Sequence, residues 1–184
     1  MKRILTMAVV MGLASVAQAA TVDQIRLTPG EITAKEAVGA GAGTSGVAGI
    51  HTTVLLGDPA KPGLYTIRLS IPANTTIQAH THRDNRSAIV MSGTWYFGYG
   101  SVAKDAATKP LPPGSFYTEP GGVAHFALTR AEPVVVYITG FGPTDTVYLN
   151  AANDPRDKWR NHDRHSQPFP VLTRTVVGQR KWII

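Results

Sequence analysis

The sequence predicts an all-β domain, either a small barrel or a double-sheet jelly roll, and two observations lead to this prediction. Short runs rich in β-branched and aromatic residues recur between residues 51 and 150, separated by turn-forming Gly, Pro, Asn and Asp. The same stretch has no sustained period of 3.6 residues, so helices contribute little to it. The chain has 184 residues with 18 Gly and 13 Pro, which suits a single turn-rich domain.

Six segments have the composition of strands, and together they predict a barrel over residues 51–150. The segments are residues 51–57, 63–71, 76–82, 87–100, 115–119 and 133–142. The fourth is unusually aromatic, with Trp95, Tyr96, Phe97 and Tyr99. Alternation directs some of these rings inward, where we expect core packing or the lining of an apolar pocket.

The first nineteen residues have the three parts of a secretory signal peptide. Met1-Lys2-Arg3 is basic, residues 4–16 are apolar, and Ala17-Gln18-Ala19 carries the small residues that a signal peptidase requires. The apolar run is shorter than the about 20 residues of a transmembrane helix. We therefore expect cleavage after Ala19, a mature chain without a membrane span, and a periplasmic or secreted location.

Composition excludes several classes of function. The chain has no Cys, which excludes a disulfide scaffold, thiolate metal sites and a cysteine nucleophile. The formal charge of +6 falls to +4 when Lys2 and Arg3 leave with the signal peptide. A mildly basic, exported chain without interleaved stacking motifs is not expected to bind nucleic acid.

Two further regions flank the expected barrel. Residues 20–50 are weakly patterned, and the Gly/Ala-rich stretch 39–49 predicts a flexible lead-in. Residues 151–184 begin with a charge-dense run and end in the apolar residues 182–184. Since large apolar side chains favour burial, we expect this C-terminal tail to dock on the barrel or on a partner subunit.

Three of the six histidines predict a metal site. His80 and His82 are two residues apart in an expected strand, so their side chains share a face with Cα atoms roughly 6.5 Å apart. Two imidazoles at this spacing can bind one ion at metal–nitrogen distances of about 2.0–2.1 Å. His125 follows the tight turn at residues 120–122 and is the candidate for a third ligand.

These residues fall into two blocks that resemble the motifs of the cupin superfamily, G-x5-H-x-H-x3,4-E-x6-G and G-x5-P-x-G-x2-H-x3-N. The resemblance covers about residues 60–145. It implies a double-stranded β-helix, that is, a jelly-roll barrel, with one divalent metal at its mouth. It also implies a homodimer. The matching residues are His80, His82, Gly93, Gly114, Pro120, Gly122 and His125.

The sequence departs from this pattern at three positions. Asn74 stands where the family has its first Gly, and Thr129 replaces its final Asn. Arg86 occupies the position of the metal-binding Glu, and a guanidinium with only N–H donors cannot ligate a cation. The resemblance therefore implies three His ligands, and leaves Asp84 or Glu119 as sources of a fourth, oxygen ligand.

Two interpretations of Arg86 remain open. In the first, a regular strand places Asp84 and Arg86 on the same face as the histidine pair, and Arg86 binds a substrate carboxylate beside the metal. In the second, Arg86 pairs with Asp84 or Glu119 and holds an empty site together.

The predicted function is metal-dependent chemistry on a small organic molecule, for example a carboxylate or phenol, by oxygenation, isomerisation or a lyase reaction. Three imidazoles suit Fe, Mn, Ni, Zn or Cu and do not choose among them. Arg86 would orient an anionic group, and Glu119, Asp84 or Tyr117 would move a proton. The alternative is a non-catalytic module that binds a metal ion or a small ligand outside the cytoplasm.

The remaining histidines receive structural interpretations. His51 begins an expected strand and is interpreted as a structural residue of the barrel. His162 and His165 lie three residues apart in a charged run, which fits a solvated face better than a second metal site.

Overall fold

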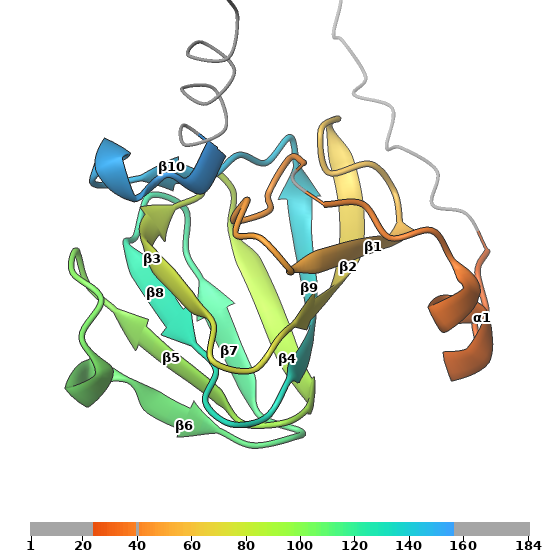
Figure 1. Cartoon of the computed structure of the whole chain (residues 1–184). Helices are drawn as coiled ribbons and strands as arrows, with labels where there is room; N and C mark the ends of the chain where they lie inside the picture. Colours follow the sequence, from red (N-terminus) through yellow and green to blue (C-terminus); the bar gives the residue numbers. More distant parts are fainter. Residues whose placement is uncertain (1–23, 40, 157–184) are drawn as a thin grey trace, which may run out of the picture.

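Two five-stranded antiparallel sheets face each other and form the fold (Figure 1). One sheet has the order β1-β2-β9-β4-β7 and the other β10-β3-β8-β5-β6. The strands are β1 His51–Leu56, β2 Gly63–Ile71, β3 Thr76–Thr81, β4 Arg86–Ser92, β5 Trp95–Tyr99, β6 Lys109–Leu111, β7 Phe116–Glu119, β8 His125–Leu128, β9 Val134–Gly142 and β10 Val147–Tyr148. The all-β jelly-roll prediction is thereby confirmed.

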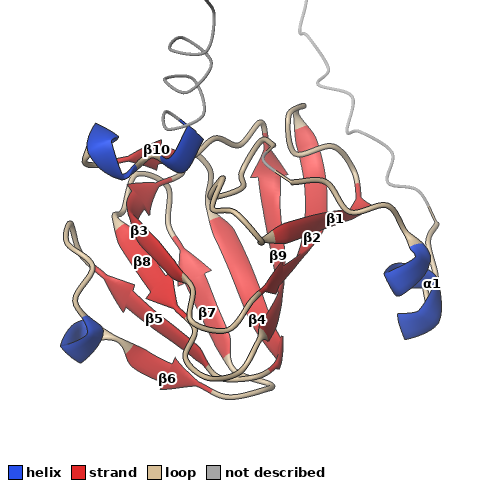
Figure 2. Cartoon of the chain, in the orientation of Figure 1, coloured by secondary structure: helices blue, strands red, loops and turns tan. Residues whose placement is uncertain are grey.

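The computed structural model describes residues 24–39 and 41–156. The expected signal peptide, His162, His165 and most of the expected tail lie outside these residues. Helices make up little of the described part: α1 Pro29–Ala34 and the short 3₁₀ turns Asp105–Ala107 and Ala151–Asn153 (Figure 2). None of the described helices has the length and apolarity needed to span a membrane.

Strand alternation produces the core between the sheets. β2 and β9 pair without interruption from Gly63↔Gly142 to Ile71↔Val134, and alternate residues of both strands are buried. β-branched and aromatic side chains fit such a half-buried pleated surface. The core members from these two strands are Tyr65, Ile67, Leu69, Ile71, Val134, Val136 and Ile138.

Most expected strands lie close to their predicted bounds, and one is divided in two. Residues 87–100 form β4 and β5, which are joined by a turn at Gly93. Gly93 has a φ of 69°, and a Cβ there would lie 2.3 Å from the carbonyl oxygen of Pro133. A glycine is therefore needed at this turn. The turn ends β4 and leads into β5, so the aromatic run forms a separate strand in the opposite sheet.

Two of the departures from the cupin pattern keep the local structure. Asn74 has a φ of 54°, the left-handed conformation that Gly adopts most readily and Asn tolerates. The Thr129 hydroxyl donates to the Pro72 carbonyl at 2.6 Å and accepts from the Thr75 N–H at 2.9 Å. These bonds tie β8 to the turn before β3, so both substitutions are structurally compatible with the barrel.

Part of the expected lead-in lies against the mouth of the barrel. Thr44, Ser45 and Ile50 are buried. The Ser45 carbonyl accepts from the Tyr148 hydroxyl at 2.5 Å, and the Gly43 carbonyl accepts from Arg86 at 3.0 Å. Residues 43–45 therefore cover the end of the barrel at which the histidines lie.

Candidate metal centre

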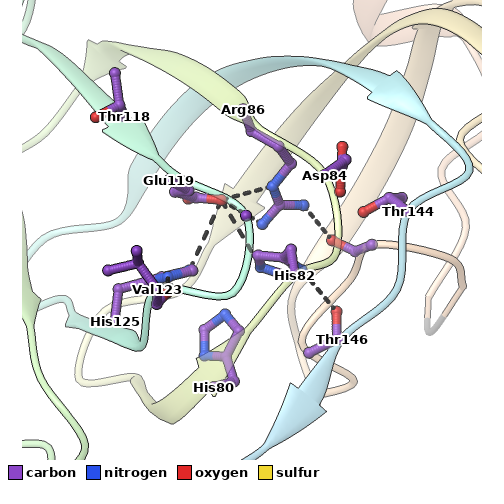
Figure 3. A network of polar contacts seen from close by, with 12 residues as sticks. His80, His82, Asp84, Arg86, Thr118, Glu119, Val123, His125, Thr144 and Thr146 are labelled. Carbon is purple, nitrogen blue, oxygen red and sulfur yellow. Dashed lines mark hydrogen bonds and ion pairs between the residues drawn. The ribbon is translucent and has the colours of Figure 1, made fainter.

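The predicted histidine triad is brought together at one end of the barrel (Figure 3). His80 on β3 and His125 at the start of β8 are direct partners in the antiparallel register, and His82 follows β3. One nitrogen from each ring lies within 4.8 Å of the others. The three residues are 6%, 2% and 1% exposed in the order 80, 82, 125, so the cluster is shielded from bulk water.

A backbone carbonyl holds each ring in one orientation. The Nδ1 atom of His80 lies 2.7 Å from the Gln78 carbonyl, and that of His125 lies 3.0 Å from the Val123 carbonyl. The Nδ1 atom of His82 contacts the Asp145 carbonyl. Because a carbonyl only accepts, Nδ1 carries the proton and Nε2 has a free lone pair.

The Nε2 atoms have the environment of metal ligands. Those of His82 and His125 are buried and have no hydrogen-bond partner among the described residues. Native structures seldom leave buried polar atoms unsatisfied, and a bound ion is one standard partner for such atoms. The buried, partnerless lone pairs therefore fit a cation bound by the three Nε2 atoms.

Electrostatics keep these imidazoles neutral. Burial lowers the pKa of His80 to about 3, with a further lowering by His125. Burial also lowers the pKa of His82, helped by the positive charge of Arg86, and lowers that of His125. Neutral imidazole is the form that binds a metal, so no proton has to leave at physiological pH.

A buried ion pair lies beside the triad. Arg86 begins β4 and Glu119 ends β7, and the two residues are register partners across the strands. The Arg86 Nε donates to Glu119 Oε2 at 2.6 Å, and a second guanidinium nitrogen contacts the same oxygen. Glu119 Oε2 also lies 3.7 Å from His82 Nε2 and 3.8 Å from His125 Nε2 (Figure 3).

The charge of Glu119 is set by these neighbours. Burial acts to raise the pKa of Glu119, but Arg86 and the nearby histidines outweigh it and lower the pKa below its usual value. Glu119 is therefore a carboxylate, oriented towards the histidines by Arg86.

The route by which Arg86 reaches the site differs from the expected one. β3 ends at Thr81 and the chain turns before β4, so residues 80–86 do not form one regular strand. Arg86 still points into the barrel because it starts the next strand, opposite Glu119. Its three guanidinium nitrogens contact Glu119 and the Gly43 carbonyl, which matches the interpretation of Arg86 as a partner of Glu119.

Asp84 and Glu119 both lie outside the group of three histidines, but Glu119 has an oxygen within 4 Å of two of their nitrogens. The Oδ2 atom of Asp84 accepts from the Tyr65 hydroxyl at 2.7 Å, and Oδ1 is buried without a partner among the described residues. The geometry therefore favours Glu119 over Asp84 as a source of an oxygen ligand.

The other predicted residues take distinct positions. Tyr117 lies two residues before Glu119 on β7 and is buried against Phe97, with ring centroids 4.4 Å apart. Burial, reinforced by Glu119, raises the pKa of Tyr117 well above 10, so it keeps its proton. His51 is exposed at the start of β1 and lies outside the triad. Trp95 and Phe97 of the aromatic strand face the core.

Several groups that build the site have no signal in the sequence. The Asp145 and Gly43 carbonyls orient His82 and Arg86 through the backbone, which any residue type could provide. Tyr65 is the hydrogen-bond partner of Asp84. In the sequence it fits the alternation of an ordinary strand, and no motif marks it as part of the site.

Comparison with known proteins supports the fold. No protein-family model matches the chain, and no curated protein matches it. The solved structure of the polyketide cyclase RemF from Streptomyces resistomycificus is 16% identical over 75% of this chain and 94% of that one, with a TM-score of 0.51.

Two further solved structures are less similar. An RmlC-like cupin from Shewanella frigidimarina is 15% identical over 65% of this chain and 92% of that one, with a TM-score of 0.48. A structure of DMSP lyases is 18% identical with a TM-score of 0.43, and the alignment covers 50% of this chain and 47% of that one. At these identities the likeness concerns the fold alone.

Proposed function

We propose that the protein is a metal-dependent enzyme that acts on a small organic molecule and holds one divalent transition metal through His80, His82 and His125. The observation that carries this proposal is that one ring nitrogen of each histidine lies within 4.8 Å of the others, and that the Nε2 atoms of His82 and His125 are buried without a partner among the described residues. Each Nδ1 is bound to a carbonyl, as is usual for metal-ligating imidazoles.

Glu119 supplies the fourth, oxygen ligand in this proposal. The family motif places a glutamate at the position of Arg86, on β4. Here a carboxylate reaches the same end of the barrel from β7, the strand paired with β4. Arg86 is a positioning residue that fixes the direction of the Glu119 carboxylate and keeps it ionised.

A metal held this way would supply Lewis acidity or activate a bound small molecule. Three imidazoles accept Fe, Mn, Ni, Zn or Cu, and the carboxylate does not restrict this set further. Oxygenation, isomerisation and lyase reactions are all compatible with a metal bound by three imidazoles and one carboxylate. Tyr117 is the neutral phenol on β7, two residues before Glu119, and we assign it a donated hydrogen bond to the substrate.

Metal content is the first test. The mature chain is dialysed against each metal in turn and its content is measured by elemental analysis. We expect one equivalent per chain in the wild type, less than a tenth in His82→Ala, and one equivalent in His51→Ala, the exposed matched control. Metal-loaded protein is then assayed for oxygen uptake and product formation with small carboxylates and phenols. Wild-type protein without bound metal would refute the proposal.

The burial of the centre supports a second candidate, a non-catalytic module that binds a metal or small ligand. All four proposed ligands are nearly fully buried, and residues 43–45 cover the mouth. A loaded protein that binds one equivalent tightly but turns over no member of the panel would favour this candidate.

Export and dimer formation are also part of the proposal. Both follow from the sequence, through the signal-like residues 1–19 and the resemblance to cupins. A periplasmic or secreted product whose N-terminus is Ala20 would support export, and size-exclusion chromatography with light scattering would report whether the mature chain is a dimer.

A further inference from the structure

A cavity of about 430 Å³ opens between the edge strands of the two sheets. β5 and β6 of one sheet and β7 of the other form its walls (Figure 1). The volume falls within the range of roughly 300–1,000 Å³ that is common for small-molecule sites. Its large apolar lining residues are Phe97, Tyr99, Leu111, Phe116 and Tyr117.

The lining of this cavity is positively charged. Lys109 on β6 is the only charged side chain among the described lining residues, and no acidic side chain lines the space. The rest of the lining is aromatic, aliphatic or neutral. An aromatic molecule with one anionic group fits such walls, because the rings provide contact area and the ammonium group pairs with the anion.

The Tyr117 hydroxyl points to a second polar contact. Tyr117 lines the cavity and is 7% exposed, and its hydroxyl has no hydrogen-bond partner among the described residues. A buried phenol O–H without an acceptor costs free energy unless a ligand supplies one. An acceptor oxygen on the bound molecule would meet this need.

The cavity lies one side chain away from the candidate metal centre. The Phe97 ring lines the cavity on one side and stacks on the His125 ring on the other, with centroids 5.5 Å apart. Tyr117 and Glu119 are alternate residues of β7 and both face inward. The Cα atoms of Tyr117 and Glu119 are therefore roughly 7 Å apart along the strand.

We propose that this cavity binds an aryl carboxylate that carries a second oxygen substituent, as the substrate of the metal centre. Lys109 binds the carboxylate, Tyr117 donates to the second oxygen, and the ring packs among the apolar lining. The assignment as substrate rests on the proposed function, whereas the binding itself does not require the metal.

The test measures binding by calorimetry to the full mature chain, with and without metal. The probes are 6-hydroxy-2-naphthoate, 2-naphthoate, which lacks the hydroxyl, and 2-naphthol, which lacks the acid. We expect 6-hydroxy-2-naphthoate to bind the wild type best. Lys109→Gln should weaken the two acids roughly tenfold and leave 2-naphthol unchanged, a loss of the size expected for one charge-assisted contact.

Tyr117→Phe should weaken the two hydroxylated probes about fivefold and leave 2-naphthoate unchanged. Lys104→Gln, a lysine outside the cavity lining, is the matched control and should bind all probes like the wild type. Circular dichroism melts confirm that each variant is folded. No binding of any probe at millimolar concentration, or binding that neither variant changes selectively, would overturn the inference.

These outcomes separate the cavity from the metal. Probe binding to a chain that takes up no metal would leave the cavity assignment standing and refute the proposed function. One equivalent of metal in a chain that binds no probe would refute the cavity assignment and leave the proposed metal centre standing.

Discussion

The buried pair Arg86–Glu119 allows a quantitative prediction for the metal-free protein. The two residues are 5% and 4% exposed, and Glu119 Oε2 accepts from the Arg86 Nε at 2.6 Å. Removing one partner leaves the other charge buried and unpaired, which costs about 3–5 kcal/mol. We therefore expect Arg86→Met and Glu119→Gln each to lower the free energy of unfolding by about that amount.

The double variant Arg86→Met/Glu119→Gln removes both charges and should recover most of this loss. Replacing a buried ion pair as a unit is often close to neutral, so we expect the double variant to be more stable than either single variant. Urea unfolding in the presence of a chelator measures all four proteins, and the cycle gives the coupling energy.

Two results would refute this reasoning. Strictly additive losses would mean that the two side chains do not interact in the folded protein. Single losses below about 1 kcal/mol would mean that the pair is hydrated rather than buried. Arg83→Met, which breaks the more exposed pair with Asp145, is the matched control and should cost no more than about 1 kcal/mol.

Three further predictions concern the residues around the site. The unfolded chain protonates His80 near pH 6.5 and the folded chain only near 3, so metal-free protein should lose about 2 kcal/mol of stability from this residue between neutral pH and pH 5. The loss should be smaller in His80→Gln. If stability fell equally with pH in the wild type and in this variant, the low pKa assigned to His80 would be contradicted. Tyr65→Phe removes the donor to buried Asp84 and should cost about 1–3 kcal/mol in urea without changing metal content. Gly140→Ala places a Cβ 2.5 Å from the Tyr65 hydroxyl oxygen and should lower the free energy of unfolding by about 1–3 kcal/mol. In the control Gly30→Ala the new Cβ meets nothing within 4 Å, and stability should not fall. Equal melting temperatures for the two variants would refute the clash.

The strands and the triad were predictable because their signals are local or are fixed by motif spacing. Alternation in residues 63–71 and 133–142 marks β2 and β9 almost residue by residue. The pair His80 and His82 was predicted from strand geometry, although β3 ends at Thr81 and His82 follows it. His125 was predicted from its place after the turn at residues 120–122, and the resemblance to the cupin motifs supported it.

The parts that escaped prediction depend on long-range pairing. The residues near Arg86 in the sequence do not predict Glu119 as its partner, because the two meet only through the β4–β7 register. β6, β8 and β10 have only 3, 4 and 2 residues, too few for a period-two pattern to stand out. The lead-in reads as flexible because its Gly and Ala residues carry no side-chain signal, whereas backbone carbonyls tie it to the barrel.

X-ray absorption on zinc-loaded mature protein tests the central claim most directly, because it reports the atoms bound to the ion. We expect three imidazole nitrogens and one carboxylate oxygen at about 2.0–2.2 Å. His125→Ala should lose one imidazole contribution, and His51→Ala should leave the spectrum unchanged. A zinc ion surrounded by water oxygens, or by fewer than three imidazoles in the wild type, would contradict the assignment.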